Sequence, residues 1–311
     1  MDKPNHVKIS VVSPVYKAEA LIEELCSRIT NVVNGLTTDF EIVLVDDCSP
    51  DNSWELISKL AQSNPHVRGI RLSRNFGQHY AIAAGLENST GEWVVVMDCD
   101  LQDVPEEIAN LYSKAMEGND VVLAQRVQRK DTFYKKATSY FFYRLLSYLT
   151  EKKQDEKVAN FGIYHRKVIR AICSMKENIR YFPTMVNWVG FKQTKIEVKH
   201  SSRGEGVSSY NLRRLLNLAL DIVLSNSEKP IRLVIKMGLF TSFLSFCYIV
   251  YIVSIHLMGK VFVLGYSSLI ISICFFSGLI ISFLGIVGLY VGKTFEGVKN
   301  RPYYIIDKTC N

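Results

Sequence analysis

Two apolar runs near the C-terminus restrict what this chain can fold into. Residues 237–258 and 261–292 contain no aspartate, glutamate, lysine or arginine. Each run exceeds the roughly 20 apolar residues that a helix needs to cross a bilayer. A pair of buried core helices is the alternative, but soluble proteins seldom carry two such runs in succession. We therefore expect two transmembrane helices after a larger first domain.

Basic side chains are placed unevenly around these runs and predict their orientation. Only Lys260 lies in the short connection between the runs. By the positive-inside rule, the more basic outer flanks face the cytoplasm. The formal net charge of +7 also suits a protein that lies against anionic lipid headgroups. The basic residues of the outer flanks are Lys229, Arg232, Lys236, Lys293, Lys299 and Arg301.

The beginning of the chain and its cysteines fit a cytoplasmic main domain. The segment 1–7 is short and polar and does not resemble a signal peptide. We therefore expect a multi-pass protein of the plasma (inner) membrane whose large domain stays on the cytoplasmic side. The seven cysteines include no Cys-x-x-Cys spacing, so they indicate neither a zinc site nor a disulfide framework. They fit a reducing compartment.

Strand and helix signals alternate in the region before the apolar runs. Apolar, β-prone segments predict strands at 7–14, at 40–45, at 67–72 and from 93 onward. Residues 20–34 predict an amphipathic helix and residues 80–86 look helical. A further helix follows the turn at 46–53, with Asp51, Asn52 or Ser53 as its N-cap. Strands that alternate with helices predict an α/β domain with a parallel sheet.

Acidic residues follow two of the predicted strands. Asp46 and Asp47 come after the second strand, and Asp98 and Asp100 follow the fourth. The carboxyl ends of such strands meet at one edge of the sheet, where ligands bind. Two aspartates separated by one residue can share Mg²⁺ or Mn²⁺ and, with it, the oxygens of a diphosphate. An ordinary acidic turn is the alternative for so short a motif.

The turn after the first strand excludes one familiar class of nucleotide-binding domain. It contains no Gly-x-Gly-x-x-Gly sequence, so the phosphate cradle of the dinucleotide-binding dehydrogenases is missing. A nucleotide held by carboxylates at strand ends, together with a metal, fits the residues better.

Four ordered motifs resemble those of family 2 glycosyltransferases. More narrowly, the chain resembles the branch that moves a sugar from a nucleotide to a polyprenyl phosphate. Dolichol-phosphate mannose synthases, bactoprenol glucosyltransferases and undecaprenyl-phosphate aminoarabinose transferases belong to this branch. The resemblance covers most of the chain. The motifs are Val-Ser-Pro-Val-Tyr at 12–16, Val-Asp-Asp-Cys-Ser-Pro-Asp at 45–51, Arg-Asn-Phe-Gly-Gln-His at 74–79 and Met-Asp-Cys-Asp-Leu-Gln-Asp-Val-Pro-Glu at 97–106.

The resemblance implies a domain organisation. We expect a cytoplasmic glycosyltransferase A-type α/β domain at 1–211 and a juxtamembrane amphipathic helix at 212–232. Two transmembrane helices at 233–292 and a cytoplasmic tail at 293–311 would follow. Members of the branch often form homo-oligomers, so a homo-oligomer is possible here, and no nucleic-acid partner is expected.

The resemblance also implies a role for individual residues. Asp98 and Asp100 would meet the donor diphosphate and a metal, Mg²⁺ or Mn²⁺, with Gln102 as a further metal ligand. The nucleoside pocket would be lined by Pro14, Tyr16, Asp46 and Asp47.

Two arginines are candidates for contact with the donor phosphates. Arg126 follows a strand-like segment at 120–125, and a planar guanidinium suits bidentate phosphate recognition. Arg203 and Ser209 lie in a segment at 203–210 that resembles the family's loop over the donor diphosphate. A solvated surface arginine and a mobile linker are the respective alternatives.

The chain departs from the branch at three positions. Ser209 stands where a lysine is common, and Lys17 stands where an asparagine is common. Asn160 occupies a position that often carries an aspartate, and an amide cannot accept a proton. A general base would then have to be another carboxylate, such as Asp103. A lipid phosphate is already an oxyanion near neutral pH and needs no base, whereas a sugar hydroxyl does.

Two segments outside the sheet resemble membrane-surface helices. Residues 133–149 mix aromatic and basic side chains, and residues 212–224 repeat this pattern before the first apolar run. Core helices with a basic face are the alternative. Helices on the bilayer would hold the active site close to a polyprenyl phosphate headgroup.

These inferences combine into one expected activity. We expect a metal-dependent, inverting glycosyltransferase that moves a sugar from a nucleotide sugar to a polyprenyl (undecaprenyl) phosphate, for cell-envelope glycan synthesis or modification. A family 2 enzyme that uses a sugar hydroxyl of a lipid-linked glycan is the nearest alternative. A processive synthase lacks support, because a Gln-x-x-Arg-Trp motif is absent. A membrane-tethered sensor of nucleotide sugars is the non-enzymatic alternative.

Overall fold

The structure is a computed structural model that describes residues 7–126, 158–175, 180–198, 229–258, 266–299 and 301–311. The chain divides into two compact units. Unit 1 comprises Met1–Lys136, Asp155–Ser209 and Arg301–Asn311, and unit 2 comprises Ala137–Gln154 and Tyr210–Asn300. The C-terminal residues therefore return to the unit in which the chain begins.

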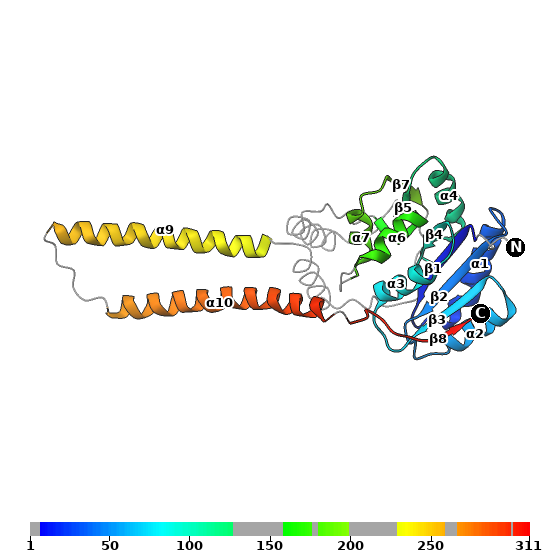
Figure 1. Ribbon diagram of the computed structural model, residues 1–311, viewed down its shortest axis with the longest axis horizontal. Coiled ribbons are helices and arrows are strands. Elements are labelled where there is room, and N and C mark those ends of the chain that lie inside the picture. Colours follow the sequence, from blue (N-terminus) through cyan, green and yellow to red (C-terminus); the bar gives the residue numbers. More distant parts are fainter. Residues whose placement is uncertain (1–6, 127–157, 176–179, 199–228, 259–265, 300) are drawn as a thin grey trace. The chain divides into compact units, whose positions relative to one another are not determined.

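Unit 1 is built on one mixed sheet with the strand order β7-β5-β6-β4-β1-β2-β3-β8 (Figure 1). Its strands are β1 (Ile9–Val15), β2 (Phe40–Asp46), β3 (Val67–Leu72), β4 (Trp93–Val96), β5 (Val121–Arg126), β6 (Val158–His165), β7 (Gln193–Val198) and β8 (Ile306–Cys310). The prediction of an α/β fold is confirmed. The strand expected at 67–72 matches β3, and the others agree with their predicted positions to within a few residues.

The pairing directions divide the sheet into parallel and antiparallel parts. β1 pairs in parallel with β2 and with β4, and β2 pairs in parallel with β3, as the alternation of strands and helices predicted. β6 lies antiparallel between β4 and β5, and β8 lies antiparallel to β3. The predicted parallel sheet is therefore present from β4 through β1 and β2 to β3, and β5 pairs in parallel with β7. β6 and β8 make the complete sheet mixed.

Helices cover both faces of this sheet. The helical elements of unit 1 are η1 (Glu19–Leu21), α1 (Ile22–Asn34), α2 (Ser53–Ser63), α3 (Gln78–Asn88), η2 (Pro105–Glu107), α4 (Ile108–Met116), α6 (Arg166–Ser174) and α7 (Phe182–Trp188). The N-cap of α2 is Asn52, one of the three residues that the sequence offered, although its side chain caps no N–H group. Asp51 Oδ1, one residue earlier, accepts hydrogen bonds from the backbone N–H of Ser53 at 3.3 Å and from its hydroxyl at 2.7 Å.

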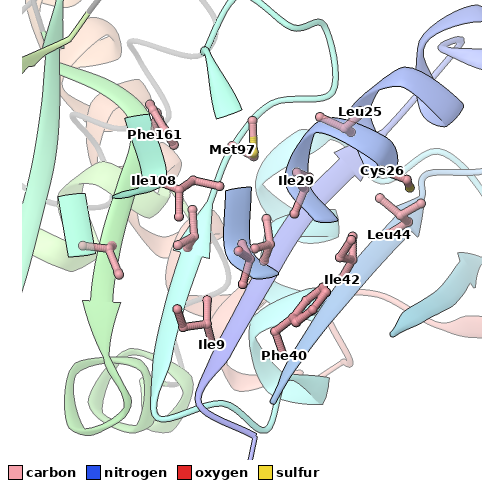
Figure 2. Packing of buried hydrophobic residues seen from close by; sticks show 14 of the residues in the cluster. Ile9, Leu25, Cys26, Ile29, Phe40, Ile42, Leu44, Met97, Ile108 and Phe161 are labelled. Atoms are coloured by element: carbon pink, nitrogen blue, oxygen red, sulfur yellow. The ribbon is translucent and has the colours of Figure 1, made fainter. Parts of the chain in front are cut away.

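Buried strand residues alternate between two hydrophobic clusters, one on each face of the sheet. Ile42 and Leu44 of β2 pack on the face covered by α1, α2 and α4, together with Leu25, Ile29 and other residues labelled in Figure 2. Val43 of β2 packs on the opposite face, which α3, α6 and α7 cover. This alternation follows from the two-residue period of a strand, and burial on both faces explains the continuous apolar runs in β1, β2 and β4.

The C-terminal residues supply an edge strand that the sequence did not predict. We expected a cytoplasmic tail at 293–311, but residues 306–310 form β8 against β3 (Figure 1). Gly69 of β3 faces Cys310 of β8, and a Cβ atom on Gly69 would lie 2.5 Å from the Cys310 sulfur. The side chains of Cys310 and of Ile57 in α2 therefore occupy the space that a side chain at this position would need.

Unit 2 contains two long helices, α9 (Lys229–Leu257) and α10 (Tyr266–Val298). They have 29 and 33 residues. At 1.5 Å per residue, their lengths are about 44 and 50 Å. Both lengths exceed the roughly 30 Å thickness of the hydrocarbon core of a bilayer. Their most apolar windows, Ile231–Tyr248 and Phe275–Gly292, are not buried within the part of the chain that the structure describes. Two apolar helices long enough to cross a membrane thus occupy the predicted region, whereas the predicted surface helices at 133–149 and 212–224 lie outside the described residues.

Candidate active site

A cavity of about 370 Å³ opens at the carboxyl ends of the parallel strands. The chain segments that follow β1, β2 and β4 supply its walls, together with the loop before α3 and the first residue of α3. It is lined by Pro14, Val15, Tyr16, Asp47, Asn75, Gly77, Gln78, Asp98, Cys99 and Asp100. The convergence of three strand ends that the sequence predicted is therefore present in the structure.

Asp47 is fixed by the loop that precedes α3. One of its carboxylate oxygens accepts the backbone N–H of Phe76 and the other accepts that of Gly77, both at 2.8 Å. Burial raises the pKa of the Asp47 carboxyl, and these two N–H groups partly offset the effect because they stabilise the anion. Gly77 has a φ of +107°, a backbone conformation that favours glycine. The turn that delivers both N–H groups therefore depends on this glycine.

Asp98 and Asp100 face the same cavity from the segment after β4. The side-chain amide of Gln78 donates a hydrogen bond to Asp98 Oδ1 at 2.6 Å. Asp100 Oδ1 accepts the backbone N–H of Gln102 at 3.1 Å, across a turn in which Leu101 has a φ of +56°. The first residue of α3 therefore orients one carboxylate, and the turn itself orients the other.

Tyr16 and Lys17 stand at the opening of the cavity. The Tyr16 side chain is 46% exposed, and the Lys17 ammonium lies 5.6 Å from the centre of its ring. The backbone N–H of Lys17 donates to the hydroxyl of Ser49 at 3.2 Å, which ties the end of β1 to the turn after β2. Lys17, which departs from the branch, therefore adds a positive charge beside an acidic cavity.

Asp46 does not line the cavity, although we predicted that it would. It is fully buried, and its Oδ1 accepts the backbone N–H of Ser49 at 3.1 Å. Arg71 forms an ion pair with Asp46 at 3.5 Å. Burial raises the pKa of Asp46 above its ordinary value, and the hydrogen bonds and Arg71 counter part of that rise. Asp46 therefore stabilises the turn after β2, while Asp47 lines the cavity.

The remaining predicted residues fall into three groups. Asp103 is 3% exposed, and neither it nor Gln102 is among the residues that line the cavity. Arg126 is the last residue of β5, paired with Val198 of β7. Arg203 and Ser209 lie outside the residues that the structure describes.

The donor atoms in the cavity suit a hard cation that is shared with a ligand. Among the described residues, no group of three or more histidine, cysteine, aspartate or glutamate side chains is arranged to hold a metal ion. Asp98 and Asp100 nevertheless offer carboxylate oxygens to the same space, and Mg²⁺ and Mn²⁺ bind through one or two carboxylates plus phosphate and water. These residues therefore fit a cation whose shell a diphosphate completes.

The sequence assigned no role to five residues that line the cavity, among them Val15 at the end of β1. Asn75, Gly77 and Gln78 belong to the motif at 74–79 that the resemblance already singled out, so their position was signalled but not their contacts. Cys99 lies between the two aspartates, and burial raises the pKa of its thiol to about 12. Cys99 is therefore protonated near neutral pH and is not a nucleophile there.

The fold and this cavity define a class of protein, and comparisons with known proteins agree. The structure resembles that of glucosyl-3-phosphoglycerate synthase from Mycobacterium tuberculosis, which was solved with Mn²⁺, UDP and phosphoglyceric acid. The TM-score is 0.52 and the sequence identity is 18%. The match covers 70% of this chain and 76% of the synthase chain. The fold is accordingly that of the glycosyltransferase A type. The family model "Glycosyl transferase family 2" matches residues 10–174.

Relatives match over nearly the whole chain. An uncharacterised glycosyltransferase of Bacillus subtilis, YkcC, is 37% identical over 98% of this chain and 94% of its own length. The undecaprenyl-phosphate 4-deoxy-4-formamido-L-arabinose transferase of Yersinia pestis is 34% identical over 97% of this chain and 93% of its own. A prophage-derived bactoprenol glucosyl transferase of Shigella flexneri is 35% identical over 97% of this chain and 98% of its own. This chain belongs to glycosyltransferase family 2.

Proposed function

We propose that this chain is a membrane-bound, inverting glycosyltransferase that moves a sugar from a nucleotide sugar to a polyprenyl phosphate. One observation carries the proposal. Asp47, Asp98 and Asp100 converge on one cavity in a chain that is similar over nearly its full length to transferases named for undecaprenyl phosphate and bactoprenol. The proposed product serves cell-envelope glycan synthesis or modification.

The cavity walls divide the binding of the donor between two sides. On one side, Pro14 and Tyr16 supply an apolar and aromatic surface for the nucleoside beside Asp47. On the other side, Asp98 and Asp100 would hold a divalent cation, Mg²⁺ or Mn²⁺, which when bound supplies charge stabilisation for the nucleoside diphosphate leaving group. Gln78 keeps the Asp98 carboxylate in a fixed orientation toward this space through its hydrogen bond.

The location of the other carboxylates favours a phosphate acceptor. A phosphate monoester has a second pKa of about 6 and is therefore an oxyanion near neutral pH. It can attack the anomeric carbon without a general base. A sugar hydroxyl needs proton removal in the transition state. Neither Asn160 nor Asp103 lines the cavity, and Asn160 has an amide that accepts no proton. The residues therefore suit direct, inverting attack by a lipid phosphate.

Chain connectivity supports a hairpin of two membrane spans with the active site on the cytoplasmic face. The chain leaves unit 1 after Ser209, passes through α9 and α10 and returns to unit 1 at Arg301. Both outer ends of the helix pair are thus joined to the same unit, so an even number of crossings is required. The basic outer flanks support a cytoplasmic location for that unit, at the plasma (inner) membrane.

A transfer assay with purified components tests this function. The full-length protein in lipid nanodiscs receives Mn²⁺, undecaprenyl phosphate and, one at a time, radiolabelled UDP- and GDP-sugars. We expect lipid-extractable label that depends on undecaprenyl phosphate and on one of the donors. Label that enters lipid only when a lipid-linked glycan is supplied would support the hydroxyl-acceptor enzyme instead. Donor binding without transfer to either acceptor would support a sensor.

A further inference from the structure

The C-terminal segment, residues 303–311, contacts both ends of one wall of the donor cavity. This donor-cavity wall consists of residues 73–88, the loop before α3 and α3 itself. At its start, the backbone N–H of Ser73 donates to the carbonyl of Ile305 at 2.9 Å. At its end, the Tyr304 hydroxyl donates to the carboxylate of Glu87. Between these two contacts lie the groups that hold the Asp47 and Asp98 carboxylates.

A buried arginine reinforces the contact at the end of α3. Arg180 is 3% exposed, and its guanidinium forms an ion pair with Glu87 at 3.3 Å. The same guanidinium lies 4.1 Å from the centre of the Tyr303 ring. A buried cation requires such partners, because removal of one leaves an uncompensated charge. Tyr303 and Tyr304 therefore contact one charge network at the C-terminal end of α3.

The C-terminal segment is itself anchored elsewhere in unit 1. β8 extends the sheet along β3, and the side-chain amide of Asn311 donates to the carbonyls of Pro65 and Val67 at 3.0 and 2.8 Å. Tyr304 and Ile306 pack against the hydrophobic cluster on the α3 face. The segment is therefore anchored on β3 as well as on the donor-cavity wall.

We propose that the C-terminal segment positions the donor-cavity wall, with Tyr304 and Glu87 as positioning residues for the donor site. Asp47 is held by two backbone N–H groups at 2.8 Å, and hydrogen bonds of this kind weaken steeply when distance or angle changes. A small displacement of the wall therefore releases Asp47 and Asp98 together. The proposal rests on the proposed function, because it assigns these carboxylates to the donor.

The segment also joins the donor cavity to the helix pair by a short stretch of chain. α10 ends at Val298, and the first contacts with Arg180 and Glu87 come at Tyr303 and Tyr304. Tyr303 and Tyr304 therefore follow soon after the end of the second apolar helix in the chain, just before β8.

Hydrogen–deuterium exchange tests the proposal without any ligand. In full-length protein we compare Tyr304→Phe with Thr309→Val, an exposed β8 residue whose substitution likewise removes one hydroxyl. We expect Tyr304→Phe to accelerate exchange of the Phe76 and Gly77 amides about tenfold. A tenfold change corresponds to about 1.4 kcal/mol in the free energy of local opening. This is close to the smallest contribution of a hydrogen bond to a charged group. Exchange in β1 should stay unchanged, and Thr309→Val should behave as wild type.

Two outcomes overturn the proposal. One is unchanged exchange at Phe76 and Gly77 in Tyr304→Phe, and the other is an equal acceleration in β1, which would indicate general destabilisation.

Glu87→Gln provides a second variant, because glutamine still accepts the Tyr304 hydroxyl but no longer pairs its charge with Arg180. We expect local acceleration there too. With the active donor, the KM for donor should rise in both variants, and kcat should fall as well, because Asp98 is released together with Asp47. Failure of all transfer would reject the proposed function, but the exchange result would still stand.

Discussion

Replacement of Gln78 by alanine tests how the Asp98 carboxylate is oriented. The Gln78 amide donates to Asp98 Oδ1 at 2.6 Å, and both side chains are half-buried. A hydrogen bond to a charged group contributes about 1.5–3 kcal/mol, and partial exposure places this one near the lower end. If that bond orients Asp98 for the transition state, kcat/KM for the donor should fall about 10-fold to 30-fold, since 1.36 kcal/mol corresponds to a factor of ten.

The assay and its control separate orientation from stability. Donor kcat/KM is measured for the full-length protein in nanodiscs with undecaprenyl phosphate, alongside the midpoint of thermal unfolding. Gln62→Ala on the exposed face of α2 is the matched control and should match wild type in both. Gln78→Glu should lose more activity than Gln78→Ala, because it adds a like charge beside Asp98. A kcat/KM for Gln78→Ala within about twofold of wild type, a difference of less than about 0.5 kcal/mol, would refute the reasoning.

Three further predictions concern the carboxylates and the C-terminal strand. Asp98→Asn or Asp100→Asn should abolish transfer while the protein stays folded and membrane-bound, and undiminished turnover by either variant would reject the assigned metal site. Because the folded-state pKa of Asp46 is raised, its contribution to stability is present at low pH and is lost as the pH rises through that pKa. The unfolding midpoint of wild type should therefore rise relative to that of Asp46→Asn as the pH falls, and a difference independent of pH would contradict this. Gly69→Ala should lower the free energy of unfolding by about 1–3 kcal/mol, because its methyl group meets the Cys310 sulfur, and an unchanged unfolding midpoint would count against this packing.

The sequence predicted the centre of the fold and of the site because both follow from local patterns. Continuous apolar runs that end in acidic residues predict buried parallel strands, and their carboxyl ends necessarily share one edge of the sheet. The convergence of Tyr16, Asp47, Asp98 and Asp100 on one cavity follows from that rule alone.

Other features depend on contacts that no local pattern encodes. Asp46 and Asp47 are adjacent, and neighbouring residues at a strand end point in different directions, so the sequence did not tell which one faces the cavity. β8 has only five residues of mixed polarity and pairs with a strand more than two hundred residues earlier in the chain. The Gln78 contact with Asp98 likewise joins a helix start to a strand end, which only the folded sheet brings together.

The position of β8 has a consequence for how the protein is made. Domains generally fold from the N-terminus during synthesis, but the edge strand of this sheet is encoded after both apolar helices. The residues that cover β3 therefore emerge from the ribosome only after α9 and α10. Until then β3 has an open edge, which is a template for pairing with other chains. Completion of the enzyme domain is thereby tied to synthesis of the residues after both apolar helices, and a protein truncated within α10 would expose that edge permanently.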